Sequence, residues 1–192
     1  MNFESLYLSS SLSISSDKII CSSSDWIGLD KEIMMDWEHP AMSASAAYVT
    51  EGGGDILEIG FGMGISAGYI QSHSVSSHTI IEPHPQMVEK AVEWSNGKSN
   101  VTIISQSWAD VTGSLSTYDG IFYDVDFDGR WNLFSSSLSG LTKSGTKVTF
   151  FNTKTEESNA FNIETTYQQV TVNPPECQYF SGSTYYMPKK EF

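Results

Sequence analysis

The chain has 192 residues, of which 39% are hydrophobic and 12% aromatic, enough for one folded domain and incompatible with wholesale disorder. Its 10 Lys and Arg residues against 23 Asp and Glu residues give a formal net charge of −13, so a nucleic-acid partner is not expected. No apolar run approaches the roughly 20 residues that span a bilayer, and we therefore expect a cytoplasmic protein with no membrane contact.

Residues 1–32 alternate only weakly in hydropathy and contain two serine triplets. They predict a loosely held N-terminal arm, and residues 33–192 predict a single domain. The domain starts with a helix from Pro40 to Val49, because proline is favoured in the first helical turn and Gly52-Gly53-Gly54 follows.

From residue 55 onward, apolar runs and amphipathic segments alternate. Strands are predicted over residues 55–59, 79–82, 101–105, 118–124, 147–151, 166–172 and 178–186. Helices are predicted through Tyr69, from Pro85 to Trp94, and from Trp131 to Leu138. The last two strands are joined by Asn173-Pro174-Pro175-Glu176, which predicts a hairpin turn. This order predicts a doubly wound α/β fold with a mostly parallel, seven-stranded Rossmann-like sheet and an antiparallel C-terminal hairpin strand.

Gly60, Gly62 and Gly64 follow the first of these strands. Open α/β sheets bind ligands at the carboxyl ends of their strands, and glycines let a ligand approach the next helix closely. The dinucleotide pattern GxGxxG is excluded because residue 65 is Ile, and the Gly-Lys-Ser/Thr of a P-loop is absent. The acidic Glu58 followed by GxGxG is instead typical of S-adenosylmethionine binding in class I methyltransferases.

Two further strand ends support this cofactor prediction. Glu82 ends the next strand, where a carboxylate can accept hydrogen bonds from both ribose hydroxyls. Trp108 follows the third strand and would contact the adenine. The predicted cofactor residues are Glu58, Gly60, Phe61, Gly62, Met63, Gly64, Glu82, Pro83, Ser107, Trp108 and Asp124.

Several segments resemble guanidinoacetate N-methyltransferases and the related fungal arginine δ-N-methyltransferases. The matching segments are Met34–Met42, Leu57–Gly64, His78–Glu82, Trp108–Val111, Tyr118–Asp124 and Pro174–Tyr179. The Trp-Glu-x-Pro-x-Met block and the Gly-Phe-Gly-Met-Gly run are more specific than the general cofactor pattern. The resemblance implies an S-adenosylmethionine-dependent enzyme, a monomer or homodimer, that methylates a small guanidino compound such as arginine or guanidinoacetate.

By this resemblance, Glu38 and Asp124 match the two carboxylates that hold the guanidino group. Trp37, Met42 and Asp126 are predicted as further substrate contacts, although Asp126 differs from the residues that usually follow the aspartate in that family. A guanidinium has a pKa above about 12, so one nitrogen becomes nucleophilic only when a proton leaves. Two carboxylates hold such a planar cation. We expect Asp124 to accept the proton and Glu38 to orient the substrate. From position alone, Glu38 would complement a helix dipole and Asp124 would cap a turn.

Two other functions remain open: methylation of another small amine or carboxylate, and non-catalytic binding of S-adenosylmethionine or S-adenosylhomocysteine. Segments 124–138 and 152–165 are shorter than in the family and leave little room for its long helix before the last two strands. The run from Asp124 to Gly129 matches half of an EF-hand loop, but Ser135 stands where calcium needs a Glu. No metal site is therefore expected.

Overall fold

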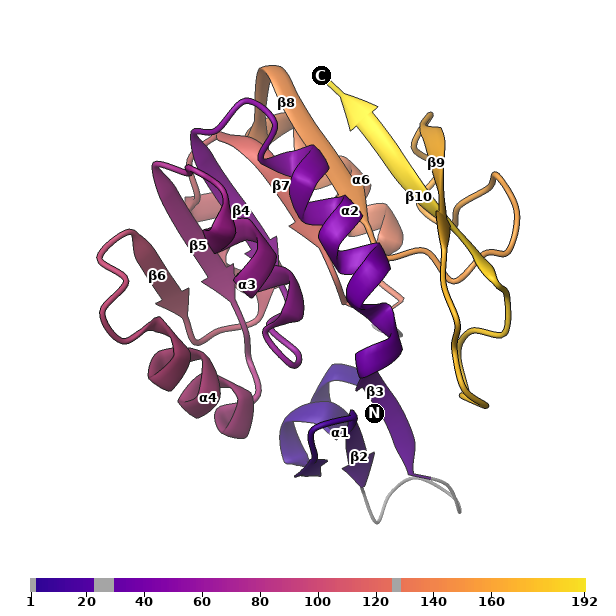
Figure 1. Ribbon diagram of the computed structural model, residues 1–192. Coiled ribbons are helices and arrows are strands. Elements are labelled where there is room, and N and C mark those ends of the chain that lie inside the picture. Colours follow the sequence, from indigo (N-terminus) through magenta and orange to yellow (C-terminus); the bar gives the residue numbers. More distant parts are fainter. Residues whose placement is uncertain (1–2, 23–29, 126–128) are drawn as a thin grey trace.

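The computed structural model describes residues 3–22, 30–125 and 129–192. These residues form a small N-terminal sheet and a seven-stranded main sheet whose strand order is β6-β5-β4-β7-β8-β10-β9 (Figure 1). The strands of the main sheet are β4 (Asp55–Ile59), β5 (Ser77–Ile81), β6 (Val101–Ile104), β7 (Tyr118–Tyr123), β8 (Thr142–Phe150), β9 (Thr166–Thr171) and β10 (Thr184–Glu191). Strands β4 to β8 are parallel, and β10 is antiparallel to both β8 and β9. The predicted doubly wound sheet with an antiparallel end is confirmed.

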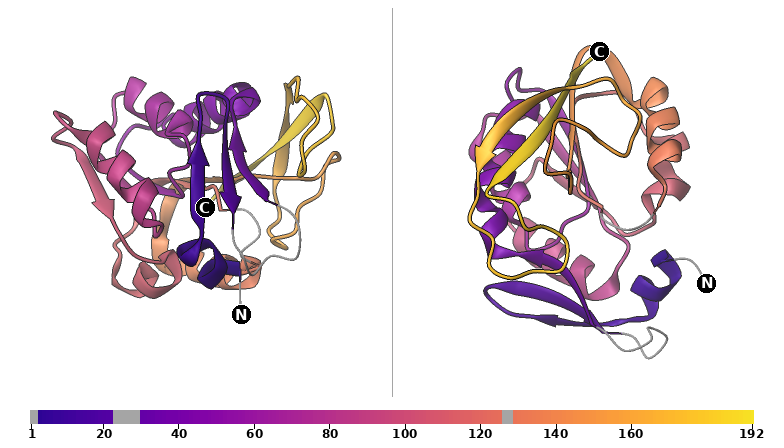
Figure 2. Two further views of the ribbon diagram at one scale, coloured as in Figure 1. Left: turned by 90° about the horizontal axis from the view of Figure 1, so that it is seen from below. Right: turned by 90° about the vertical axis from the view of Figure 1, so that its right-hand side faces the viewer.

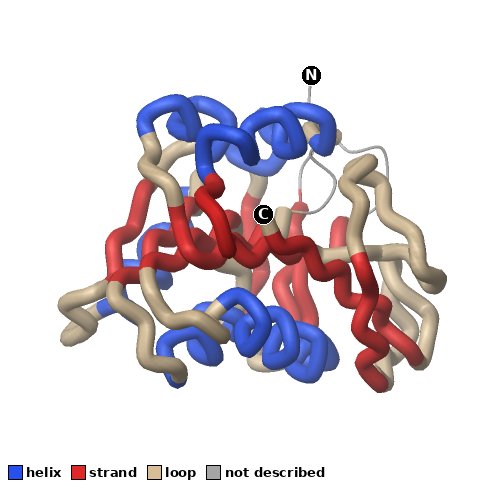
Figure 3. The backbone as a smooth tube through the Cα atoms, turned by 90° about the horizontal axis from the view of Figure 1, so that it is seen from above, coloured by secondary structure: helices blue, strands red, loops and turns tan. Residues whose placement is uncertain are grey.

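Helices cover both faces of the main sheet (Figure 3). They are η1 (Asp36–Glu38), α2 (His39–Val49), α3 (Ile65–Ser72), α4 (Pro85–Ser95), α5 (Trp108–Val111), η2 (Thr112–Ser114) and α6 (Trp131–Leu141). Buried residues of α2, α3 and α4 belong to one hydrophobic cluster, and those of α5 and α6 belong to the other. In the described part of the chain, no helix is long and apolar enough to cross a bilayer.

The strands divide their side chains between these two clusters. Ile56 of β4 and Phe122 of β7 belong to the cluster under α2 and α3, whereas Leu57 and Tyr123 belong to the cluster under α6. Successive side chains of a strand point to opposite faces, so a strand covered on both faces must be apolar throughout. Adjacent apolar residues such as Ile56-Leu57 and Phe122-Tyr123 therefore mark the central strands in the sequence.

The N-terminal segment differs from the predicted loose arm. It contains the helix α1 (Phe3–Ser9) and an antiparallel sheet of β1 (Ser11–Ile14), β2 (Lys18–Ser22) and β3 (Lys31–Met35). Strand β3 crosses the predicted boundary between residues 32 and 33. Ile19 and Cys21 are fully buried, and the backbone N–H of Leu12 donates to Oε1 of Gln86 on α4 at 2.9 Å. These elements lie at the carboxyl ends of the parallel strands (Figures 1 and 2).

The C-terminal strands also differ from the prediction. The last strand is Thr184–Glu191 instead of residues 178–186, so residues 172–183 form a long connection and not a tight hairpin turn at Pro174-Pro175. Strand β10 was hard to recognise because it contains Pro188 and ends in charged residues, although Tyr185 and Met187 are fully buried. Residues 152–165 contain no helix, as their short length predicted.

Candidate active site

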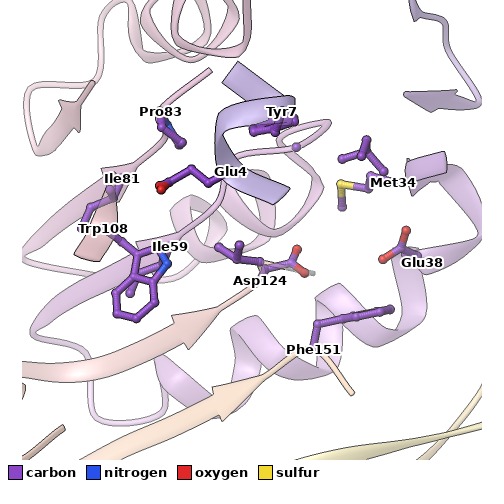
Figure 4. A pocket seen from close by; sticks show the side chains of 13 residues that line it. Glu4, Tyr7, Met34, Glu38, Ile59, Ile81, Pro83, Trp108, Asp124 and Phe151 are labelled. Carbon is purple, nitrogen blue, oxygen red and sulfur yellow. The ribbon is translucent and has the colours of Figure 1, made fainter. Parts of the chain in front are cut away.

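A cavity of about 870 Å³, including its open mouth, lies at the carboxyl ends of β4, β5 and β7 (Figure 4). Its walls come from the N-terminal segment, the glycine loop after β4 and the ends of the strands. The lining residues are Glu4, Tyr7, Ile33, Met34, Glu38, Ile59, Gly62, Ile81, Pro83, Trp108, Asp124, Val125 and Phe151. Most of this wall is apolar, and its charged groups are carboxylates.

The glycine loop is shaped by positive φ angles and by close neighbours. At Gly60 φ is +96°, and a Cβ atom would lie 2.2 Å from the carbonyl oxygen of Asp124. At Gly62 φ is +51°, and a Cβ atom would lie 2.4 Å from Sδ of Met34. Gly64 is the left-handed N-cap residue of α3. A side chain at Gly60 would collide with the backbone of Asp124 and one at Gly64 with the ring of Phe61, so these glycines allow the tight path of the loop. Gly62 itself lines the cavity.

Glu82 follows β5, as predicted, but its carboxylate lies behind the cavity wall. Its oxygens accept hydrogen bonds from the backbone N–H groups of Phe61 at 3.1 Å and His84 at 2.8 Å, and from the hydroxyl of Tyr7 at 3.4 Å. Burial raises the pKa of Glu82 to about 7. Tyr7 therefore connects helix α1 to the residue expected to hold the ribose.

Glu58 lies away from the cavity, in contrast to its predicted cofactor contact. Its side chain is fully buried between β4 and α3, where it accepts a hydrogen bond from Ser66 and lies 2.9 Å from Nε2 of His78. Alternation along β4 explains this placement, because residue 58 faces the same side of the sheet as Ile56. Glu58 thus holds the start of α3 against the sheet.

Glu38 and Asp124 lie on the cavity wall and point into the same space from different sides (Figure 4). Glu38, in η1, is only 3% exposed, and its Oε1 accepts hydrogen bonds from the backbone N–H of Met35 at 2.8 Å and the hydroxyl of Tyr179 at 2.6 Å. Asp124 directly follows β7, and its backbone N–H donates to the carbonyl of Ile59 at 2.8 Å. After burial itself, the charges of both carboxylates raise the pKa values of Tyr179 and Tyr185.

Trp108, which the sequence predicts to contact the adenine, forms part of the cavity wall. Its ring packs edge-on against Tyr123, with ring centroids 5.4 Å apart, and against Phe134, with centroids 6.1 Å apart. The neighbouring Ser107 is buried beside the wall, where its hydroxyl accepts a hydrogen bond from Arg130 at 3.2 Å. Arg130 also forms an ion pair with Glu4 of α1.

Four other predicted residues support the cavity without lining it. Met42 is fully buried in the core, and Trp37 stacks on Phe180 with ring centroids 5.3 Å apart. Phe61 packs on Trp94 beneath the glycine loop, with centroids 5.7 Å apart, and the backbone N–H of Met63 lies 3.1 Å from Sδ of Met34.

The predicted substrate contact Asp126 and the centre of the EF-hand-like run lie outside the described residues. Within the described ranges, no three His, Cys, Asp or Glu side chains are grouped as metal ligands.

Sequence reasoning missed several cavity residues. Glu4 and Tyr7 belong to the weakly patterned N-terminal segment, and nothing in their spacing indicated a site. Met34 lies within a segment that resembles the family, and that position was the available signal. The same holds for Tyr179, which contacts Glu38 from outside the cavity wall. Phe151 follows β8 and was assigned only to a strand end.

Known proteins share sequence with most of this chain. The model of the guanidinoacetate N-methyltransferase family matches residues 22–138. Protein arginine N-methyltransferase 2 of Aspergillus oryzae is 34% identical over 158 residues, which cover 77% of this chain and 37% of that protein. The corresponding protein of Aspergillus fumigatus is also 34% identical, over 77% of this chain and 36% of its own length. The chain thus spans little more than a third of these relatives.

Solved structures share the fold at low sequence identity. Spermidine synthase from Thermotoga maritima superposes with a TM-score of 0.62 at 12% identity, over 94% of this chain and 72% of its own. The N-methyltransferase NodS from Bradyrhizobium japonicum superposes with a TM-score of 0.58 at 12% identity, over 81% of this chain and 97% of its own. The sheet is therefore that of class I methyltransferases, and the family match shows that the chain belongs to the guanidinoacetate N-methyltransferase family.

Proposed function

We propose that this chain is an S-adenosylmethionine-dependent N-methyltransferase that acts on a guanidino nitrogen of a small cation such as arginine or guanidinoacetate. The observation that carries the proposal is the pair of carboxylates, Glu38 and Asp124, directed into one cavity beside the glycine loop. Membership of the family supports the same reaction.

The cofactor would occupy the part of the cavity between the glycine loop and Trp108. Gly62, Pro83 and Trp108 line this part, and the carboxylate of Glu82 lies directly behind it. Gly62 presents no side chain to this part of the cavity. When bound, the cofactor supplies a methyl group on a positively charged sulfonium.

The other part of the cavity suits a planar cation. No Lys or Arg is among its described lining residues, and the wall is mostly apolar, so the two carboxylates act in a medium that strengthens their attraction for a cation. A guanidinium presents its N–H groups in a fork that matches carboxylate oxygens. Glu38, held through Oε1, would orient the group. Asp124 would accept the proton that one nitrogen loses as it attacks, which leaves that nitrogen's electron pair for the new bond.

The test is mass spectrometry of the products after incubation with S-adenosylmethionine and either arginine or guanidinoacetate. We expect a singly methylated guanidino compound. Tight cofactor binding with no product would favour a non-catalytic cofactor-binding protein, and methylation only of amines or carboxylates would show that the acceptor class is wrong.

The role of Asp124 is tested by Asp124→Asn, with Asp110→Asn on the exposed face of α5 as the matched control. We expect Asp124→Asn to lower kcat at least about 100-fold, because the acceptor of the proton is lost, and to leave cofactor affinity within about threefold. The control should behave as the unmodified chain. Retained activity in Asp124→Asn would contradict its role as base.

A further inference from the structure

The long connection between β9 and β10 reaches the candidate active site. Tyr179 lies in this connection, 141 residues from Glu38 in sequence, yet its hydroxyl donates a 2.6 Å hydrogen bond to Oε1 of Glu38. Tyr179 is not itself on the cavity wall. A long-range bond to a substrate-facing carboxylate suggests that this connection has a task beyond joining two strands.

The residue before Tyr179 is fastened to the N-terminal sheet. The backbone N–H of Gln178 donates to Oε2 of Glu32 on β3 at 2.8 Å, and the N–H of Glu32 donates to Oε1 of Gln178 at 3.3 Å. The side-chain amide of Gln178 also donates to the carbonyl of Asp30 at 2.9 Å. These three bonds fix the backbone next to Tyr179.

Aromatic packing restricts the ring of Tyr179 on its other sides. Its centroid lies 6.0 Å from Trp37, the residue before Glu38, and 6.2 Å from Phe151 of the cavity wall. Phe180 stacks on the same Trp37 at 5.3 Å. This packing holds the ring in the position from which its hydroxyl reaches the carboxylate of Glu38.

Tyr179 is suited to remain a donor. Burial first, and then the negative charge of Glu38 and its hydrogen bond, raise the pKa of Tyr179 far above its ordinary value. The hydroxyl therefore stays protonated across the working pH range of most enzymes. It stabilises the ionised form of Glu38, the form that holds a cation.

The local bond to Oε1 of Glu38 comes from the N–H of Met35, at 2.8 Å. The hydroxyl of Tyr179 and the N–H of Met35 hold this one oxygen from two distant segments of the chain. Because Cγ, Cδ and Oε1 define the carboxylate plane, the Tyr179 hydroxyl restricts rotation of that plane about the Cγ–Cδ bond, and the plane decides whether a planar guanidinium can pair edge to edge.

We propose that Tyr179 is a positioning residue for methyl transfer, whose hydroxyl sets the plane of the Glu38 carboxylate toward the guanidino group. This inference rests on the proposed function. It makes the connection between β9 and β10, together with the N-terminal sheet on which it is fastened, part of the substrate-recognition apparatus.

The test is Tyr179→Phe, which keeps the ring packing and removes the hydroxyl. We expect kcat/KM for the guanidino substrate to fall about tenfold or more, with the cofactor dissociation constant changed less than about twofold. Tyr69→Phe is the matched control, because it removes a hydroxyl that contacts only the exposed His39 among its described side-chain partners, at 3.1 Å. The control should leave both quantities unchanged.

A double-variant cycle distinguishes positioning from packing. If Tyr179 acts through Glu38, then adding Tyr179→Phe to Glu38→Ala, which removes the acceptor of its hydroxyl, costs nothing further, in turnover or in the calorimetric affinity of guanidinoacetate for the protein loaded with S-adenosylhomocysteine. Additive losses, or a Tyr179→Phe variant as active as the unmodified chain, would overturn the proposal. Gln178→Ala removes the side-chain bonds that fasten the connection but keeps the hydroxyl of Tyr179. It should lower kcat/KM by a smaller factor than Tyr179→Phe does, and it provides the test if Tyr179→Phe folds poorly.

The unmodified chain separates the two proposals. If it neither methylates nor binds any guanidino compound, the proposed function fails and the role of Tyr179 fails with it. If it is active and Tyr179→Phe matches it, only the role of Tyr179 fails.

Discussion

Gly60 is the position in the candidate site where a side chain has least room. A Cβ atom there would lie 2.2 Å from the carbonyl oxygen and 3.1 Å from the carbonyl carbon of Asp124, and real Cβ contacts essentially never fall under 3.0 Å. Both are backbone atoms and cannot rotate away. At φ of +96° an L-residue also pays a conformational penalty of about 1–2 kcal/mol. With about 1–3 kcal/mol for forced displacement, Gly60→Ala should lower the free energy of unfolding by about 2–5 kcal/mol.

Urea unfolding of Gly60→Ala, followed by fluorescence, measures this loss. Because the displaced backbone belongs to Asp124, methyl transfer should fall together with stability. Gly68→Ala is the control, since Gly68 lies inside α3 with no atom within 4 Å of its Cβ position. It should stabilise the protein by about 0.5–1 kcal/mol, as alanine does in helices. The reasoning is refuted if Gly60→Ala unfolds at the same urea concentration as the unmodified chain and keeps its activity.

Three other predictions concern the surroundings of the cavity. Burial raises the pKa of Glu82 from 4.5 to about 7, so the contribution of its protonated form to stability is complete below pH 4.5 and is lost as the pH rises through 7. The free energy of unfolding in urea should therefore be lower at pH 8 than at pH 5, by up to about 3 kcal/mol, and this difference should be absent in Glu82→Gln. Ser66→Ala deprives the buried carboxylate of Glu58 of a donor and should cost about 1–3 kcal/mol in the same assay, and an unchanged value would show that another donor replaces it. Arg130→Gln breaks the ion pair with Glu4 and should speed hydrogen exchange in α1, measured by mass spectrometry; unchanged exchange would show that the pair does not hold this helix.

The central fold was predictable because its strands obey a simple rule. Strands β4, β5 and β7 are covered on both faces, so each contains adjacent apolar residues that pack into the two clusters, and β4 and β5 are followed by helices. The N-terminal sheet has a different character, because its strands are four or five residues long and β1 and β2 alternate buried residues with exposed or half-buried ones. In strands this short, the alternation of apolar and polar residues extends over too few positions to distinguish a strand from a coil in the sequence. Strand β10 was misplaced because Pro188 and the charged residues around it are unusual in a strand flanked on both sides.

The candidate site was predictable only where it depends on local sequence. The placement of Asp124 after β7 and of Gly62 after β4 follows from the strand ends, and both line the cavity. The direction of the Glu58 side chain depends on which face of β4 packs under α3, and strand ends do not specify this. Tyr7 and Tyr179 reach the site through contacts between distant segments, which a single sequence does not contain.

The position of β10 between β8 and β9 has a consequence for the order in which the site is assembled during synthesis. Strand β9 pairs only with β10 among the described strands, so residues 166–171 have no sheet partner until residues 184–191 have been made. Tyr179 lies between these two strands and is placed when they pair. The parallel strands that carry the glycine loop and Asp124 are complete much earlier in the chain. A nascent chain would therefore form the cofactor half of the cavity first, and Glu38 would gain its distant hydrogen-bond donor only in the last step of folding.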